Sequence, residues 1–104
     1  MANVKLKASL GDASNLPGNV VKTDTYTAQV TDYVIVCNKG TAMTINLFAA
    51  TGSNKILKIK SIGAGVVTVD GDGSETIDSS TTATLNQWDA IEIMDYASGK
   101  WIIL

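Results

Sequence analysis

Residues 33–47 read YVIVCNKGTAMTINL, and the patterns in this stretch decide the fold class. Residues 33–37 form an unbroken apolar run, which is typical of a strand covered on both faces. Residues 38–40 supply an Asn-Lys-Gly turn, and apolar and polar side chains then alternate through residues 43–47. We therefore expect two strands that are joined as a hairpin.

The same period of two recurs along the chain, whereas the 3, 4 and 7 spacing of an amphipathic helix does not. Turn residues rich in Gly, Asp, Ser and Asn separate the apolar runs, giving about nine short strands. The sequence predicts an all-β, single-domain, antiparallel β-sandwich that is jelly-roll-like and carries an extended N-terminal arm. Residues 1–24 are expected to form the N-terminal strand and arm, and residues 25–104 the sandwich.

The alternation also predicts which side chains form the core. In residues 33–37 the pattern does not decide whether the odd-numbered or the even-numbered side chains face the core, because every residue there is apolar. The expected core residues are Val34, Val36, Ile45, Leu47, Leu57, Ile59, Val67, Val69, Ile91, Ile93 and Ile103.

Composition narrows the class of function. The chain has 104 residues, enough for one core, and only 17 % of them are charged. The formal charge is −2 and all eight basic residues are Lys, so no basic stripe is available for nucleic acid. No apolar run is long enough to cross a bilayer, and the first residues lack a signal-peptide core, so neither a membrane nor export is expected.

The residue types needed for most catalysis are missing. The chain has no His and no Arg, which removes the commonest general base and the bidentate anion clamp. The single cysteine, Cys37, lies in an apolar run and is expected to be a small buried hydrophobe rather than a nucleophile. We therefore expect no enzyme, no catalytic residue and no cofactor.

Four carboxylates lie close together in sequence around two glycines, and they form the one weak candidate for a metal site. Calcium favours several oxygens offered by a tight loop, but the spacing here lacks the order of a known calcium loop. A hairpin turn explains the Asp-Gly-Asp-Gly run equally well. The candidate ligands are Asp70, Asp72, Glu75 and Asp78.

Two tryptophans, Trp88 and Trp101, are candidate anchors for a protein partner, since aromatic residues often carry binding energy at interfaces. Each stands near the start of an expected strand, where packing in the core or at its rim is the alternative.

The second half of the chain resembles a β-module of tailed-bacteriophage virion proteins. The resemblance rests on VTVDGDGSETID at residues 67–78, TLNQWDAIEI at residues 84–93 and GKWII at residues 99–103. Residues 33–38 and 44–47 look like the opening strands of that module, so the likeness extends over about residues 25–104. It implies a β-sandwich in a virion and commonly a homotrimer.

Fibre proteins carry this module after long shafts, whereas only residues 1–24 precede it here. We therefore expect a capsid decoration, or cement, protein that binds the major capsid protein on the outside of a phage head after synthesis in the host cytoplasm. The alternatives are a tail or head fibre module that binds a host receptor and a tail or baseplate connector. The expected partner-binding residues are Val4, Leu6, Leu10, Leu16, Pro17, Val20, Trp88 and Trp101.

Overall fold

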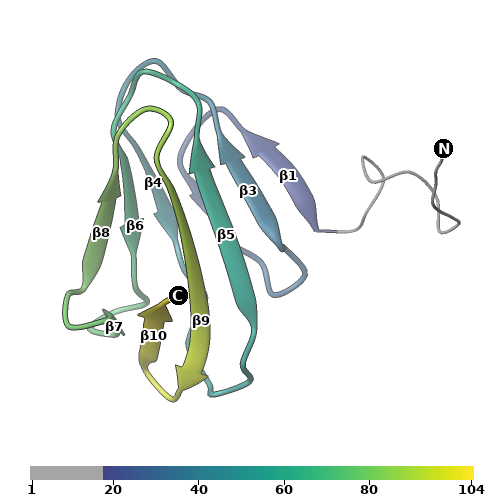
Figure 1. Cartoon of the computed structure of the whole chain (residues 1–104), viewed down its shortest axis with the longest axis vertical. Helices are drawn as coiled ribbons and strands as arrows, with labels where there is room; N and C mark the ends of the chain where they lie inside the picture. The colour runs from purple at the N-terminus through teal and green to yellow at the C-terminus, as the bar shows by residue number, and fades with distance from the viewer. Residues whose placement is uncertain (1–17) are drawn as a thin grey trace, which may run out of the picture.

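A computed structural model of the chain describes residues 18–104, which form two packed β-sheets (Figure 1). The six-stranded sheet A has the order β1-β3-β5-β9-β10-β7, and the four-stranded sheet B has the order β2-β4-β6-β8. No helix of the described part is long and apolar enough to cross a membrane. The strands are β1 Asn19–Lys22, β2 Tyr26–Thr27, β3 Val34–Cys37, β4 Met43–Asn46, β5 Ile56–Ser61, β6 Val67–Asp70, β7 Thr76–Ile77, β8 Thr82–Leu85, β9 Ala90–Ala97 and β10 Lys100–Ile103.

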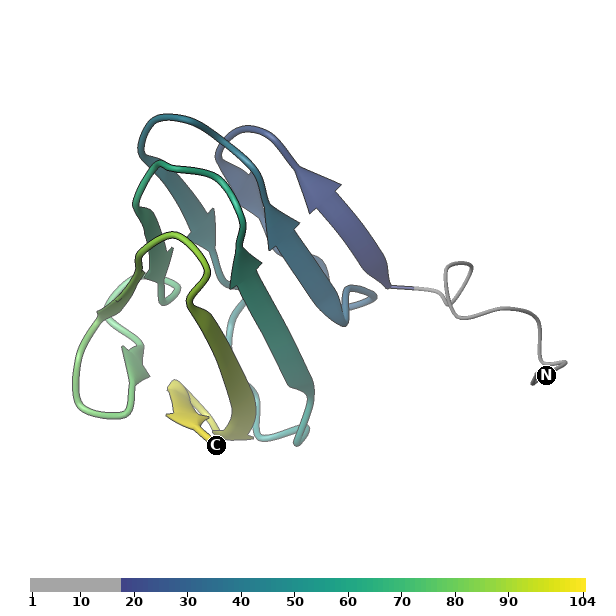
Figure 2. The same cartoon turned by 45° about the horizontal axis from the view of Figure 1, so that its top comes forward.

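The first six strands wind as a coil between the two sheets. Odd-numbered strands β1, β3 and β5 lie side by side in sheet A, and even-numbered strands β2, β4 and β6 lie side by side in sheet B. All four pairings within these two sets are parallel. Figure 2 shows the resulting stack of turns, in which connections from sheet A to sheet B pass over one end of the molecule and connections from sheet B to sheet A return at the other.

The second turn of the coil (β3 and β4) and the third turn (β5 and β6) are stacked, and the same register of residue pairs continues from sheet A to sheet B. Cys37 pairs with Ser61 in sheet A, Met43 pairs with Val67 in sheet B, and the connecting residues keep the same offset. At this corner the Gly65 amide donates to the Lys39 carbonyl at 2.9 Å. A Cβ on Gly65 would overlap the Thr41 carbonyl, so the close approach of the two turns requires glycine there.

The last strands close the coil with antiparallel pairings. β8 pairs with β6 in sheet B, while β9 pairs with β5 and β10 pairs with β9 in sheet A. The short β7 returns to sheet A and pairs with β10 in parallel. Each sheet therefore combines a parallel part made by the coil with an antiparallel part.

The core lies between the two sheets, and in most strands the buried side chains are those that the alternation of apolar and polar residues predicts. Ile45, Leu47, Leu57, Ile59, Val67, Val69, Ile91 and Ile93 are all buried as expected. In β3 the opposite parity holds: Ile35 and Cys37 are buried, and Val34 and Val36 face outward and are half-buried. The expected burial of Cys37 is confirmed.

At the last strand the core residue differs from the expected one. Trp101 is fully buried and its ring meets that of Phe48 edge-on, with centroids 5.2 Å apart. Ile103 has the parity of the core residue Ile93, but it is exposed because β7 pairs with β10 only at Lys100 and Trp101. The interior is therefore sealed by Trp101 instead of Ile103.

The all-β class and the two-sheet architecture are confirmed, but the antiparallel connectivity is wrong. Five of the eight strand pairings are parallel, and no jelly-roll arrangement is present among residues 18–104. The expected hairpin in residues 33–47 is a crossing from β3 in sheet A to β4 in sheet B. Sheet A also begins with β1, before the boundary expected at residue 25.

Candidate interaction surface

The outer face of sheet A follows directly from the inward alternation of its strands. Ile35, Ile59 and Ile91 lie in one row across β3, β5 and β9 and point into the core. The residues before and after them point to the opposite face. The rows of this outer face are Val21, Val36, Lys60 and Ala90; Asn19, Val34, Lys58 and Glu92; and Ile56, Met94 and Ile102.

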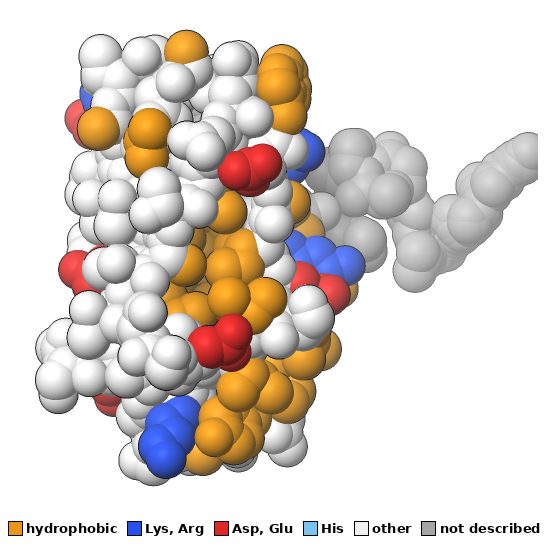
Figure 3. Space-filling model, turned by 60° about the vertical axis from the view of Figure 1, so that its left-hand side comes forward, with side chains coloured by type: hydrophobic (Ala, Val, Ile, Leu, Met, Phe, Trp, Pro, Cys, Tyr) orange, Lys and Arg blue, Asp and Glu red, His pale blue; other side chains and the backbone are white. Residues whose placement is uncertain are grey.

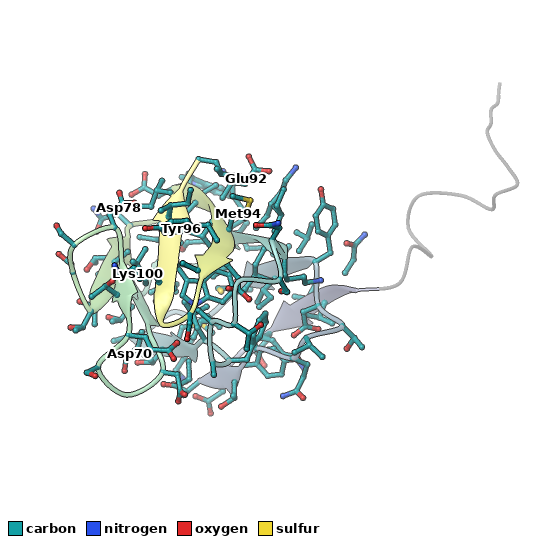
Figure 4. All side chains as sticks on the ribbon, turned by 90° about the horizontal axis from the view of Figure 1, so that it is seen from below. Asp70, Asp78, Glu92, Met94, Tyr96 and Lys100 are labelled. Atoms are coloured by element: carbon teal, nitrogen blue, oxygen red, sulfur yellow. The ribbon has the colours of Figure 1, made fainter. Side chains whose placement is uncertain are left out.

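Apolar side chains make up much of this outer face. Val21 has 63 % of its surface exposed and Tyr96 has 43 %. The larger aliphatic residues between them are half-buried, namely Val34, Val36, Ile56, Met94 and Ile102. Figure 4 labels Glu92, Met94 and Tyr96, which follow one another along β9 on the outside of the sheet. A sheet face with this composition is partly apolar and open to a partner.

Two of the charged groups on this face, Lys58 and Glu92, form an ion pair. The Lys58 ammonium lies 3.5 Å from a Glu92 carboxylate oxygen and 5.4 Å from the centre of the Tyr33 ring. The Tyr33 side chain and the Glu92 carboxylate raise the pKa of Lys58, so this lysine stays charged. The pair and the exposed Tyr33 ring together give the face a polar strip between its apolar residues.

The outer face of sheet B has a different composition. Its strands place Thr44, Thr68 and Thr84 in one row and Thr27, Asn46, Asp70 and Thr82 in the next. Each of these residues is short and polar, and threonine is common at outward strand positions. Sheet B therefore has no apolar outer row among the described strands, and the two faces of the molecule are chemically distinct.

A smaller apolar area lies at the end of β10. Ile103 and Leu104 are both exposed, and their amides donate to Asp78 Oδ1 and to the Glu92 carbonyl, each at 2.9 Å. Figure 3, which shows the side of the molecule that carries β7, β8 and β10, has hydrophobic side chains gathered in a hollow between polar margins.

The structure separates the expected partner-binding residues. Trp101 is fully buried, so its side chain is not free for a partner. Val20 lies in β1, is half-buried and packs partly against the core. Trp88 remains a surface residue. Five others lie outside the described residues: Val4, Leu6, Leu10, Leu16 and Pro17.

Trp88 stands in a well-held turn between β8 and β9, with 63 % of its surface exposed. Its amide donates to the Ser61 carbonyl at 2.9 Å, and its own carbonyl accepts from the Lys60 ammonium. The backbone at Trp88 has φ of 75°, in the left-handed region that residues other than glycine seldom adopt. The surrounding hydrogen bonds thus hold a large apolar ring out in solvent.

The four carboxylates that formed the weak metal candidate do not converge. Glu75 Oε1 accepts from the Ala50 amide at 2.8 Å, and Asp78 accepts from Ile103. Asp70 lies on the outer face of sheet B, apart from Asp78 (Figure 4), and Asp72 is in the exposed turn that follows it. Among residues 18–104 no three His, Cys, Asp or Glu side chains are grouped to hold a metal ion.

Sequence reasoning missed the outer face of sheet A as a site. Its signal was present, because Met94 and Ile102 are apolar residues at positions that alternate with the core. A solvent-exposed strand face normally has polar residues there, as sheet B does. The expected parity of β3 also hid Val34 and Val36, which belong to this face.

No family model, no curated protein and no solved structure matches the chain.

Proposed function

We propose that this chain is a non-enzymatic structural protein that binds other protein surfaces through the outer face of sheet A. The observation that carries the proposal is the contrast between the two outer faces. Sheet A presents Val21, Ile56, Met94, Tyr96 and Ile102, whereas sheet B presents only short polar side chains. An apolar patch with a polar margin is a common mark of a protein contact.

The partner we propose for this face is a second and a third copy of the same chain, in a homotrimer. A patch that packs against neighbouring copies needs apolar centre residues and tolerates paired charges such as Lys58 and Glu92. The absence of His and Arg from the sequence fits a role that depends on contacts rather than on proton transfer.

The role we propose for the trimer is capsid decoration on a tailed phage, with the major capsid protein as the target. Support for this step comes from the resemblance of residues 67–103 to a virion β-module. Decoration requires many modest contacts repeated by symmetry, because a trimer multiplies the affinity of three weak attachments. A fibre module or a tail or baseplate connector remains the alternative assignment within the virion.

The test is the mass of the purified protein in solution, measured by light scattering across a dilution series. We expect the wild-type chain of 10.9 kDa to form a trimer. Met94→Lys places a charge between Ile56 and Ile102 at the centre of the apolar face and is expected to shift the mass to that of the monomer.

Thr68→Lys is the matched control, because Thr68 is equally central in the outer face of sheet B, between Thr44 and Thr84. This variant is expected to keep the trimer. A wild-type monomer at every concentration, or equal loss of the trimer in both variants, would contradict the assignment of the face. Co-sedimentation of the wild type and Met94→Lys with purified phage heads then tests decoration itself.

Receptor binding is the second candidate, and the exposed Trp88 favours it. A tryptophan ring held in solvent by backbone hydrogen bonds is suited to stack on a sugar or on another apolar ligand. If this role is correct, Trp88→Ala will lose binding of the labelled protein to host cells while keeping its mass. Unchanged cell binding in Trp88→Ala would remove this candidate.

A further inference from the structure

Two Asp-Gly pairs follow one another where β6 ends and the chain turns toward β7, namely Asp70-Gly71 and Asp72-Gly73. An Asp-Gly peptide bond is chemically labile, because glycine has no Cβ to keep its amide nitrogen away from the preceding side-chain carboxyl carbon. Bonding of that nitrogen to that carbon closes a cyclic imide. No other Asp or Asn of the chain precedes Gly. Since the two pairs share one intrinsic chemistry, the fold decides which of them reacts.

The first pair is held in the ladder of sheet B. The Asp70 carbonyl accepts from the Leu47 amide at 2.8 Å, and the Gly71 amide donates to the Thr81 carbonyl at 3.0 Å. Gly71 is buried, and a Cβ there would lie 2.5 Å from the Glu75 carbonyl oxygen. The Gly71 nitrogen can therefore reach the Asp70 carboxyl group only when this end of the ladder opens, and local opening populates only a small fraction of the molecules.

The second pair lies outside the ladder. Asp72 and Gly73 are both exposed, and a Cβ at Gly73 would meet no atom within 4 Å. Within residues 18–104 the Gly73 amide donates no hydrogen bond, and the Asp72 carboxylate accepts none and forms no ion pair. The two reacting groups can therefore meet without breaking a hydrogen bond that either of them makes.

The other exposed aspartates of the described part are less reactive by the same criteria. Asp78 Oδ1 accepts from the Ile103 amide, and Asp89 Oδ2 accepts from the Asn86 amide, each at 2.9 Å. Asp24 precedes a β-branched threonine, whose side chain crowds the amide nitrogen. The two remaining aspartates, Asp32 and Asp95, are buried and hydrogen-bonded.

We propose that Asp72 is a site of spontaneous backbone isomerisation to isoaspartate, and that the fold protects Asp70 from the same reaction. Water is the only co-reactant. This inference goes beyond the proposed function and does not depend on it.

The reaction has two steps. In the first, the Gly73 nitrogen bonds to the side-chain carboxyl carbon of Asp72, and the carboxyl hydroxyl leaves with the amide proton as water. In the second, water adds to one of the two imide carbonyl carbons and breaks the bond from that carbon to nitrogen. Breaking the side-chain bond restores Asp, whereas breaking the main-chain bond leaves isoaspartate. No electron is transferred, and the product differs from the starting chain in connectivity and in one oxygen taken from the solvent.

The product changes a turn that is tied to another part of the fold. The Asp72 carbonyl, which accepts from the Glu75 amide at 3.0 Å, becomes a free carboxylate, and the main chain gains one carbon atom at this point. Glu75 Oε1 in turn accepts from the Ala50 amide at 2.8 Å. The modified turn is therefore next to a contact with the connection from β4 to β5.

The experiment is incubation of the full chain in heavy-oxygen water at neutral pH and physiological temperature, followed by digestion in ordinary water and mass spectrometry. Each passage through the imide adds one solvent oxygen to the aspartate, and electron-transfer fragmentation locates both the label and the isoaspartate. We expect label at Asp72 to accumulate at least about tenfold faster than label at Asp70, because the ladder must open before Asp70 reacts.

The same incubation in urea is the matched control. Unfolding removes the ladder, so Asp70 and Asp72 are then expected to react at rates that agree within about threefold. Asp72→Glu in the folded chain is a second control, because one more methylene group enlarges the ring and slows its closure. This variant is expected to lose the label at residue 72 and to keep the rest of the labelling pattern.

Three results would overturn the proposal. The first is absence of label at Asp72 in the folded chain, and the second is equal labelling of Asp70 and Asp72 there. The third is faster labelling of Asp78 or Asp89 than of Asp72.

Discussion

Among single residues, Asp95 has the most concentrated set of hydrogen bonds. Its buried carboxylate, 1 % exposed, accepts from the backbone amides of Thr51 and Gly52 at 2.9 and 2.6 Å and from the Ser53 hydroxyl at 2.9 Å. Burial acts to raise the pKa of Asp95, but these hydrogen bonds favour the charged form and hold the pKa below its ordinary value. One side chain thus fixes the connection from β4 to β5.

Asp95→Asn tests this role. An amide cannot accept from all of these donors and brings its own N–H groups toward them, so we expect a loss of about 2 kcal/mol in the free energy of unfolding. Urea denaturation at neutral pH measures it. Asp72→Asn, in an exposed turn, is the control and is expected to change stability by less than about 0.5 kcal/mol.

The same substitution has a pH signature. Because the folded-state pKa of Asp95 is lowered, its contribution is present above the unfolded pKa of about 4 and is lost as pH falls through the folded value. The stability difference between wild type and Asp95→Asn should therefore shrink below about pH 4. A difference that stays constant across this range would show that Asp95 does not act through its charge.

At the scale of elements, the coil depends on turns that stack as closely as its strands do. The corner from β3 to β4 lies against the corner from β5 to β6, with the Gly65 amide bonded to the Lys39 carbonyl. Adding a methyl group at Gly65 would force the Thr41 backbone away, whereas a methyl group at Gly40 would meet no atom within 4 Å.

Gly65→Ala is therefore expected to lower the free energy of unfolding by about 3 kcal/mol, the upper part of the range for overpacking. Gly40→Ala is the matched control in the stacked corner and is expected to be neutral or stabilising by up to about 1 kcal/mol. Thermal unfolding of the two variants measures the difference. Similar melting temperatures for both would mean that the two corners are not in contact.

Strand positions were largely predictable from alternation, but the pairing of strands was not. Val67 and Val69, or Ile91 and Ile93, show the same period of two whether the next strand returns in the same sheet or crosses to the other. The turn at residues 38–40 has residues that suit both connections. Every residue of β3 is apolar, so the sequence could not show which of its side chains face the core. Only the tertiary contacts decide that Ile35 is buried and Val34 faces outward.

The candidate site was less predictable than the fold. Trp88 and Trp101 were both candidate anchors near strand starts, but only Trp88 lies on the surface, whereas Trp101 is buried. What separates them is φ of 75° at Trp88 and the pairing of Trp101 with Asp95 and Ile77 in sheet A. The sequence alone carries neither fact.

For the whole molecule, the coil and its antiparallel closure share one core. Residues from the coil, such as Ile35 and Ile45, and from the closure, such as Ile93 and Trp101, belong to a single buried cluster. Strand β9 also joins the two parts through its ladder with β5. We expect residues 18–104 to unfold as one cooperative unit.

Equilibrium urea unfolding of a Trp88→Phe variant tests this expectation, because its remaining tryptophan, Trp101, reports on the core. The fluorescence transition and the far-ultraviolet circular dichroism transition are expected to have the same midpoint. Two separated midpoints would show that the coil of β1–β6 and the closure of β7–β10 unfold independently.

The position of β9 has a consequence for the order of events on the ribosome. Strands β1–β6 leave the exit tunnel first, and each of β3, β4, β5 and β6 can pair with a strand made before it, since these pairings run from early to late in the chain. Strand β5 has no hydrogen-bonded neighbour on the side away from β3 until β9 emerges and places Ile91 and Ile93 beside its core residues. A nascent chain stalled before residue 90 would therefore expose a parallel sheet edge next to other growing copies, and synthesis that pauses there should favour aggregation.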